Sequence, residues 1–351
     1  MPRSNEAWPI SLDTSPMEAL LVDELPEDDG WQFEPKWDGF RCLAFKAGDS
    51  AELRAKSGKP LSRFFPEIVD ALRSLKPDRF AIDGELVIPF GASLSFDALQ
   101  MRLHPAESRI RKLSKETPAL LVLFDMLADT RGRSLLERPL AQRREALEKF
   151  FASLKTPGAL RLSSCTHKRA EAQRWLARTG GVLDGVVAKR LDGPYKPGER
   201  AMLKVKKLST ADCVVGGFRY ANKERHIGSL LLGLYDEEGK LNHVGFTASI
   251  PSASRKALTG RLEKLVAPPG FTGRAPGGPS RWSTERSVDW RPLKPRLVVE
   301  VRYDHVTDHR FRHGTKLMRW RPDKDPHQCT FEQLQRPRSA AEIVQKTLAI
   351  N

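Results

Sequence analysis

Apolar residues in this chain come only in short runs. The longest uninterrupted run, Ala119 to Phe124, is far below the roughly 18 residues that a membrane-spanning helix needs. Runs of this length that are rich in Val, Leu, Ile and Phe are typical of strands. We therefore expect a globular protein built on sheets, without a membrane span.

Strand-like and helix-like segments alternate as far as Val205, after an irregular lead-in over residues 1 to about 20. Helical periodicity is clearest between Leu140 and Leu154, and a second helix is expected over 169–178, ending before a pair of glycines. This alternation predicts an α+β domain with mainly antiparallel sheets. The expected strands cover residues 40–45, 80–88, 119–127, 183–189 and 202–205.

The pattern changes to strands after a polar joint at 206–210. One helix interrupts these strands, and we expect Ser252 to cap it. Several short strands with one helix in about 120 residues fit a small β-barrel such as an OB-fold. The expected strands cover residues 213–220, 229–235, 243–247 and 297–303. The predicted domains are therefore 1–208, 209–335 and a C-terminal tail, 336–351, with a helix over 340–348.

Basic residues outnumber acidic ones by 59 to 44, which gives a net charge of +15. The excess is concentrated between Arg281 and Lys324, where 12 basic and 6 acidic residues give a net charge of +6. This indicates a polyanionic partner such as nucleic acid, although a solvated basic surface is the alternative. The four cysteines are too far apart for a zinc knuckle, and no signal-peptide pattern opens the chain. We expect a protein of the reducing cytoplasm.

Short motifs that combine lysines, carboxylates and glycines recur along the chain. A lone Lys-x-Asp-Gly motif often occurs by chance, so the functional interpretation depends on the whole ordered set of motifs. The expected setting of the first is just before a strand, that of the second is a strand turn, and the paired lysines should share one strand face. In order, the motifs are Glu34-Pro35-Lys36-Trp37-Asp38-Gly39-Phe40-Arg41, Ile82-Asp83-Gly84-Glu85-Leu86, Leu183-Asp184-Gly185-Val186-Val187-Ala188-Lys189, Lys204 with Lys206, and Arg319-Trp320-Arg321-Pro322-Asp323-Lys324.

A lysine amine can carry a phosphoryl group as a reactive phosphoramidate. At an unperturbed pKa of about 10.4, only about one lysine in 2,500 is neutral at pH 7. Nearby cations disfavour the ammonium form, because like charges repel. Lys36 is therefore the candidate nucleophile, and we expect the fold to gather Arg41, Lys189, Lys204, Lys206 and a bound Mg²⁺ around it.

This ordered set resembles the motifs of the covalent nucleotidyltransferases and, among them, the ATP-dependent DNA ligases, over roughly residues 15 to 330. The run Leu183–Lys189 and the approach Phe311–Gly314 are similar to those of the small bacterial C-type ligases. The resemblance implies an adenylation (nucleotidyltransferase) domain followed by an OB-fold domain. It also implies an enzyme that uses ATP to seal nicks between a 5′-phosphate and a 3′-hydroxyl in duplex DNA, through a lysyl-AMP intermediate, in DNA repair.

The resemblance assigns catalytic and metal-binding roles to matching positions. Lys36 would be the nucleophile that carries AMP, and Lys204 and Lys206 would hold the α-phosphate and offset its charge. Glu85 and Asp184 would face the metal, since hard oxygen ligands suit Mg²⁺, with Mn²⁺ as an alternative.

Other matching positions would bind the nucleotide. Glu34 would accept a hydrogen bond from the adenine amino group, and Arg41 with Glu85 would hold the ribose and adjacent phosphate. Phe124 would stack on the purine, and a plain core phenylalanine is the alternative. Lys56 and Lys189 complete this group of cations. The sixth motif would orient the pyrophosphate or contact the DNA backbone through Arg319, Arg321, Asp323 and Lys324.

Three positions depart from the common ligase pattern. Asp184 stands where Glu is usual, so a water could intervene between it and a metal. Lys56 stands where many ligases carry Arg, and lysine cannot make the two-pronged contact of a guanidinium. A Trp often precedes the paired lysines, whereas Ala201-Met202-Leu203 stands here.

Four other functions are alternatives on the sequence. An RNA ligase or an mRNA-capping guanylyltransferase would share the Lys-x-Asp-Gly-x-Arg logic. A ligase that uses NAD⁺ is disfavoured because the cysteine spacing provides no four-cysteine zinc site. A DNA-binding protein with a decayed transferase domain would bind nicks without becoming adenylylated. For the ligase, we expect a monomer in the bacterial cytoplasm, associated with the nucleoid, with repair proteins as further partners and no membrane.

Overall fold

The computed structural model describes residues 7–91, 93–177, 183–206, 208–221, 225–277, 289–307 and 309–334. They form two compact units, and the second begins at Leu208. The predicted helix over 340–348 lies outside the described residues, as do position 207 of the predicted joint and the end of the predicted helix 169–178. Within the described ranges, no helix is both long enough and apolar enough to cross a membrane.

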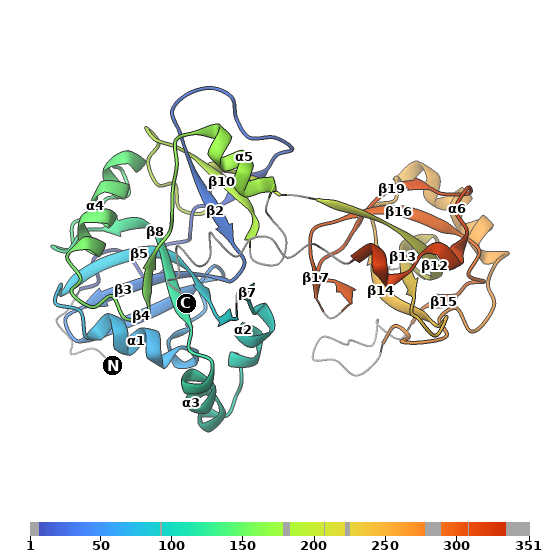
Figure 1. Cartoon of the computed structure of the whole chain (residues 1–351), viewed down its shortest axis with the longest axis horizontal. Coiled ribbons are helices and arrows are strands. Elements are labelled where there is room, and N and C mark those ends of the chain that lie inside the picture. The colour runs from blue at the N-terminus through green and yellow to red at the C-terminus, as the bar shows by residue number, and fades with distance from the viewer. Residues whose placement is uncertain are drawn as a thin grey trace. The chain divides into compact units, whose positions relative to one another are not determined.

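A five-stranded sheet is the centre of the first unit, with strand order β4-β3-β5-β8-β9. All neighbours are antiparallel except β8 and β9. Helices α1 (Pro66–Arg73) and α4 (Leu140–Ala152) share one apolar core with this sheet, because Leu72 and Leu147 join the same cluster (Figure 1). The strands are β3 (Phe40–Ala47), β4 (Ser50–Ala55), β5 (Arg79–Val87), β8 (Leu120–Ala128) and β9 (Leu160–Leu162).

A four-stranded sheet completes the first unit, with order β1-β11-β10-β2. It comprises β1 (Ala19–Leu21), β2 (Trp31–Trp37), β10 (Leu183–Arg190) and β11 (Met202–Val205), and α5 (Arg169–Ala177) packs against β2 and β10. Strand β1 corrects the expectation of an irregular lead-in, because it pairs in parallel with β11. Strand β2 contains Pro35 and was not expected as a strand. A proline is tolerated there because β2 is at the end of the sheet.

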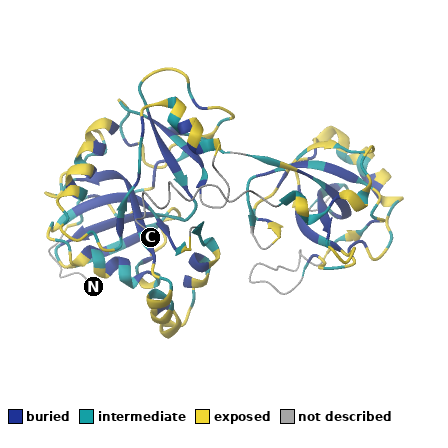
Figure 2. Ribbon diagram, in the orientation of Figure 1, coloured by how far each residue is buried: buried dark blue, intermediate teal, exposed yellow. Residues whose placement is uncertain are grey.

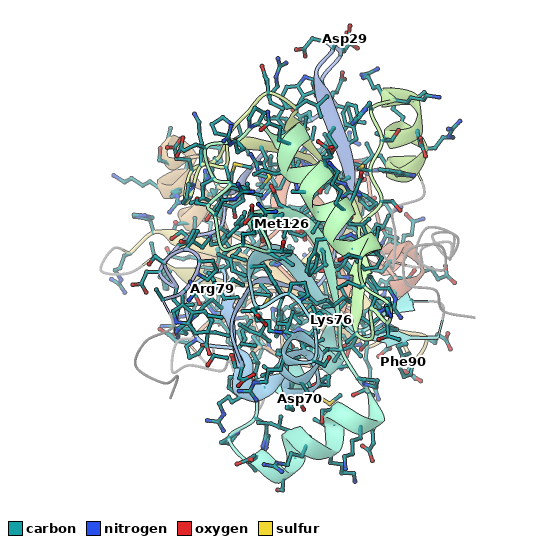
Figure 3. The ribbon with its side chains drawn as sticks, turned by 90° about the vertical axis from the view of Figure 1, so that its left-hand side faces the viewer. Asp29, Asp70, Lys76, Arg79, Phe90 and Met126 are labelled. Carbon is teal, nitrogen blue, oxygen red and sulfur yellow. The ribbon has the colours of Figure 1, made fainter. Side chains whose placement is uncertain are left out.

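Shorter elements surround these sheets in the first unit. They are η1 (Ser62–Phe64), the hairpin of β6 (Pro89–Phe90) and β7 (Ser93–Leu94), α2 (Phe96–Arg102) and α3 (Glu107–Glu116). Helix α3 is largely exposed, and of its residues only Ile110 is buried (Figure 2). Met126 of β8 lies in the interior, whereas Phe90 lies at the surface (Figure 3).

A second sheet system forms the other unit, with order β14-β13-β12-β16-β19, and β15 (Arg291–Pro292) also pairs with β12. The two end strands meet at an isolated bridge between Thr247 and Thr315. The strands are β12 (Ser209–Tyr220), β13 (Ile227–Tyr235), β14 (Leu241–Thr247), β16 (Val298–Tyr303) and β19 (Lys316–Trp320). The remaining elements are β17 (Val306–Thr307), β18 (Arg310–Phe311), η2 (Pro326–Gln328) and η3 (Phe331–Leu334).

The expected cap of the helix in this unit is wrong. Helix α6 spans Ser252–Glu263, and Pro251 occupies its N-cap position without a side-chain hydrogen bond. A serine caps a helix when it occupies the N-cap position, immediately before the first helical residue. Ser252 is itself the first helical residue of α6.

Candidate active site

A cavity of about 1000 Å³ in the first unit is lined by residues of both sheets. Side chains of β2, β10 and β11 form one wall, and side chains of β3, β5 and β8 form another. Segments 16–19 and 55–64 contribute further residues to the lining. The predicted site residues in this lining are Glu34, Lys36, Arg41, Lys56, Glu85, Phe124, Lys189 and Lys204.

Strand alternation explains which side chains of the smaller sheet reach the cavity. Glu34 and Lys36 are two residues apart on β2 and so share one face. In the register, Glu34 is opposite Val187, which is in turn opposite Lys204 on β11. The face that carries Lys36 therefore also carries Lys204. Lys36 was expected to precede a strand, but it lies within β2, and the strand that follows is β3.

Gly185 brings the strands around Lys36 close together. Its φ of +143° disfavours any residue with a side chain, and an added Cβ would lie 2.1 Å from the carbonyl oxygen of Val205. Gly185 is paired with Lys36, and the register shifts between Leu183 and Gly185. This local irregularity places Asp184 beside Lys36.

Asp184 holds two lysine side chains at once. Its Oδ2 lies 2.5 Å from Lys36 Nζ and 3.0 Å from Lys206 Nζ. Burial alone would raise the pKa of Asp184, but Lys36 and Lys206 together lower it. Lys206 was expected on the same strand as Lys204, but β11 ends at Val205. The shared carboxylate nevertheless holds Lys206 next to Lys36.

Lys204 lies in a strongly cationic environment. Burial lowers its pKa, and the charges of Lys36, Lys206 and Lys56 lower it further. Lys56 is itself more exposed and lies 3.1 Å from Glu18 Oε1. The cavity wall therefore presents several positive charges to any bound group.

Arg41 is held by Asp83, a residue of the neighbouring strand β5. Its Nε and Nη2 each donate to one oxygen of Asp83, both at 2.6 Å, and Nη2 also donates to the carbonyl of Met17 at 3.3 Å. Burial alone would lower the pKa of Arg41, but the Asp83 carboxylate reverses this and raises it. The Tyr195 hydroxyl donates to Asp83 at 2.6 Å and accepts the N–H of Met17 at 2.9 Å.

Glu85 lies within the same strand as Asp83, two residues further along, so the expected strand turn is wrong. Burial raises its pKa to about 7, although Lys36 and Arg41 act in the opposite direction. Its Oε1 accepts the backbone N–H of Gly39 at 3.2 Å. Near neutral pH this carboxyl group therefore exists in both protonation states.

The buried carboxylate of Glu34 has two polar partners. Gln32 Nε2 donates to Oε1 at 2.7 Å, and Lys189 Nζ lies 2.8 Å from Oε2. All three residues are buried, with exposed fractions of 1–3 %. The carboxylate thus has a fixed orientation in the cavity wall.

Phe124 reaches the cavity because of a β-bulge. Asp83 is opposite Asp125 and Gly84 is opposite Leu123, so Phe124 has no partner on β5. Bulges re-aim side chains and are common next to active sites. Arg41 Cζ and Lys189 Nζ each lie 4.6 Å from the centroid of the Phe124 ring. A base that stacks on this ring must share it with these cations.

The sixth-motif residues lie in the second unit, where they form ion pairs of their own. Arg319 Nε lies 2.6 Å from Glu300, and Arg321 donates to both oxygens of Asp212 and to Asp323. Lys324 Nζ lies 3.8 Å from Asp212. Among the described residues, no group of three or more acidic, histidine or cysteine side chains is arranged to hold a metal.

Sequence reasoning missed Asp83, Tyr195 and Gln32. Asp83 had a signal, since it lies two residues from Glu85 on one strand and must share its face. Gln32 has the same relation to Glu34 on β2. No sequence signal connects Tyr195 with Asp83, because the two residues lie 112 positions apart along the chain.

Comparison with known proteins identifies the family over most of the chain. Residues 16–206 match the family model described as "ATP dependent DNA ligase domain", and residues 223–324 match "ATP dependent DNA ligase C terminal region". The chain is 42 % identical to DNA ligase C2 of Mycolicibacterium smegmatis, over 95 % of this chain and 98 % of that protein. It is 27 % identical to the multifunctional non-homologous end joining DNA repair protein LigD of Mycobacterium tuberculosis, over 86 % of this chain and 37 % of that protein.

Solved structures agree at the level of fold. One solved structure is described as a Lig E DNA ligase that binds DNA with a minimal scaffold. It is 17 % identical in sequence and has a TM-score of 0.56, and the match covers 87 % of this chain and 99 % of that one. This likeness extends over both units.

Proposed function

The chain belongs to the family of ATP-dependent DNA ligases, and from this premise we propose that it seals nicks in duplex DNA through a covalent adenylate on Lys36. The observation that carries the proposal is the position of Lys36 in the wall of the large cavity, beside Asp184, Lys204 and Lys206. Burial and the charges of Lys36 and Lys206 lower the pKa of the neighbouring Lys204, because like charges repel. A neutral amine is the form that attacks phosphorus.

The proposed reaction has three phosphoryl transfers. The amine of Lys36 attacks the α-phosphorus of ATP, so an N–P bond forms and the bond to pyrophosphate breaks. The AMP then passes to the 5′-phosphate of a nick, and the Lys36 amine is released. Finally the adjacent 3′-hydroxyl attacks that phosphate, which forms the phosphodiester and releases AMP. Lys204 and Lys206 offset the negative charge of the transferring group.

The nucleotide would lie between the two sheets. Glu34 accepts a hydrogen bond from the adenine amino group, and Phe124 contacts the purine. Arg41 and Glu85 face the ribose and the adjacent phosphate. The ion pair between Arg41 and Asp83 supports this arrangement, because it fixes Arg41 over the Phe124 ring, next to the proposed ribose and phosphate position. Lys56 and Lys189 add positive charge to the same wall.

Divalent Mg²⁺, or Mn²⁺ in its place, would accompany ATP. Glu85 in the cavity wall and Asp184 beside Lys36 supply oxygen ligands of the kind that Mg²⁺ prefers. Two carboxylates fit an ion that keeps several waters and takes its other ligands from phosphates. When bound, the ion would neutralise phosphate charge.

The second unit would be an OB-type barrel that contacts DNA. The bridge between Thr247 and Thr315 supports closure, because it joins the two end strands of the sheet. Arg319 is well exposed and could bind a phosphate oxygen in place of Glu300. In this proposal, Arg321, Asp323 and Lys324 orient either the pyrophosphate or the DNA backbone.

We place the enzyme in bacterial DNA repair, as a monomer of the nucleoid-containing cytoplasm with repair proteins as partners. The similarity to part of LigD supports a repair role. An RNA ligase remains the competing activity. A sealing assay that compares nicked DNA with nicked RNA–DNA hybrids separates the two.

The central test is labelling with α-³²P-ATP. The wild-type chain should acquire label in the presence of Mg²⁺ and release it to nicked DNA, whereas Lys36→Ala should acquire none. Lys149→Ala is the matched control, because Lys149 is an exposed lysine on α4 that pairs only with Glu145 in the described contacts. Label on the Lys36→Ala protein would overturn the assignment.

A further inference from the structure

Three buried polar side chains form a continuous group at one end of the cavity wall. Gln32 and Glu34 are alternate residues of β2, and Lys189 is opposite Gln32 on the neighbouring strand β10 (Figure 1). Lys189 therefore reaches Glu34 diagonally across the two strands, at a distance that side chains of this length span. Glu34 and Lys189 line the cavity, whereas Gln32 is not part of its lining.

The two partners take different oxygens of the Glu34 carboxylate. Gln32 donates to Oε1 at 2.7 Å, and Lys189 lies 2.8 Å from Oε2. The last torsion of a glutamate is soft, so a single partner would leave the carboxylate plane free to turn. Two partners on opposite oxygens set that plane. The amide of Gln32 must present nitrogen here, because its oxygen would face a second acceptor.

A carboxylate held in this way can only accept further hydrogen bonds. It has about four acceptor sites, of which Gln32 uses one, while Lys189 lies 2.8 Å from Oε2 as an ion pair. Because Glu34 lines the cavity, an unused site is available to a ligand bound there. An exocyclic amino group of a base can donate a hydrogen bond to such a site. A carbonyl oxygen in the same place cannot donate one and would be repelled by the carboxylate. Lys189 also lies over the Phe124 ring, so the group adjoins the proposed purine position.

From these contacts we infer that Gln32 is the positioning residue for base selection: it orients Glu34 so that the site accepts a 6-amino purine and rejects a 6-oxo purine. This rests on the proposed function, because it takes the nucleotide-binding wall as given. Gln32 does not touch the nucleotide. Its contribution should appear in the choice between bases and not in the chemical step.

The test compares ATP with ITP, which differ at C6 by an amino group in place of a carbonyl oxygen. Equilibrium binding of each nucleotide is measured by calorimetry, and lysyl-nucleotide formation by rapid quench. Gln32→Met preserves length and apolar volume but removes the donor. We expect the preference for ATP over ITP to fall by about tenfold or more, through a higher KM for ATP at nearly constant kcat.

A second variant keeps the test informative if the first one folds poorly. Gln32→Glu places a second carboxyl group against Glu34, so it should lose ATP preference at high pH. On acidification the introduced group becomes protonated and can donate a hydrogen bond, so the preference should recover. A residue with only a structural role would not give this pH profile. Thr259→Val, which removes a buried hydroxyl from α6 of the second unit, is the control and should leave the preference unchanged.

The outcomes separate this inference from the proposed function. Wild-type protein that binds ATP and ITP equally, or folded variants that keep the wild-type preference and show no pH-dependent recovery, would overturn the role of Gln32 while lysyl-AMP formation stands. Absence of label on Lys36 in the wild-type chain would instead overturn the proposed reaction, and the binding preference would still report on Gln32.

Discussion

Arg41 and Asp83 lie on neighbouring antiparallel strands and meet through two hydrogen bonds of 2.6 Å each. Asp83 is inaccessible to solvent, whereas part of the Arg41 side chain is exposed. The planar guanidinium matches the two carboxylate oxygens, which fixes its direction as well as its charge. The pair therefore holds one cation of the cavity at a defined place beside Phe124.

Replacing Arg41 with lysine tests the importance of that direction. An ammonium keeps the charge but cannot bond both oxygens of Asp83 and the carbonyl of Met17 in one plane. We expect lysyl-AMP formation to slow by about tenfold or more, with modest loss of stability. Single-turnover labelling with ATP measures the rate. Arg133→Lys, at an exposed ion pair with Asp129, should show no such loss.

Tyr195→Phe removes one hydroxyl from the same network. The phenol oxygen bonds both Asp83 and the backbone of Met17, and the side chain is buried. Its loss leaves a buried acceptor and a buried N–H without this partner, which should cost about 1–3 kcal/mol. Urea unfolding followed by fluorescence measures the change. Tyr220→Phe, whose hydroxyl bonds Glu263 at the surface, should cost much less, and equal losses would contradict the network.

Glu85 makes stability depend on pH. Its folded-state pKa is raised to about 7 from 4.5, so the folded state binds a proton more tightly than the unfolded chain. The corresponding contribution is fully present below about pH 4.5 and is lost as pH rises through 7. Glu85→Gln removes this titration. The stability of wild type relative to this variant should therefore fall between pH 5 and 8, by at most about 3 kcal/mol.

The measurement for Glu85 is urea unfolding of both proteins across that range without added metal ions. Comparing the two proteins cancels the titration of all other groups. A difference that rises with pH would mean that Glu85 titrates below its ordinary value, contrary to its buried position.

Gly185→Ala should disrupt the geometry around Lys36. The added Cβ would lie 2.1 Å from the Val205 carbonyl oxygen. Because that oxygen belongs to the backbone, a change of side-chain rotamer cannot relieve the clash. We expect destabilisation of about 3 kcal/mol or more from overpacking and strained backbone. Gly239→Ala is the matched control, because its φ is also positive but nothing lies within 4 Å of the added atom. Its cost should be about 1 kcal/mol, from the backbone alone.

Local sequence predicted five strands of the first unit because their apolar runs are continuous. Strand β11 has the expected limits, and β3, β5, β8 and β10 differ from expectation by one or two residues at their ends. Strands β1 and β2 were missed because one is only three residues long and the other contains Pro35. Neither shows a pattern that distinguishes it from a loop until its partner strand is known.

The amino-acid order alone determined which side chains could do the chemistry: the spacing of Lys36, Asp38 and Arg41, and the alternating carboxylates of β5, follow from neighbouring positions along the chain. Only the tertiary structure decided their partners. The guanidinium of Arg41 bonds Asp83, the amine of Lys36 meets Asp184, and Tyr195 reaches a carboxylate 112 residues away. Such pairings depend on strand register and on a bulge at Phe124, and a register is set by the packing of a whole sheet.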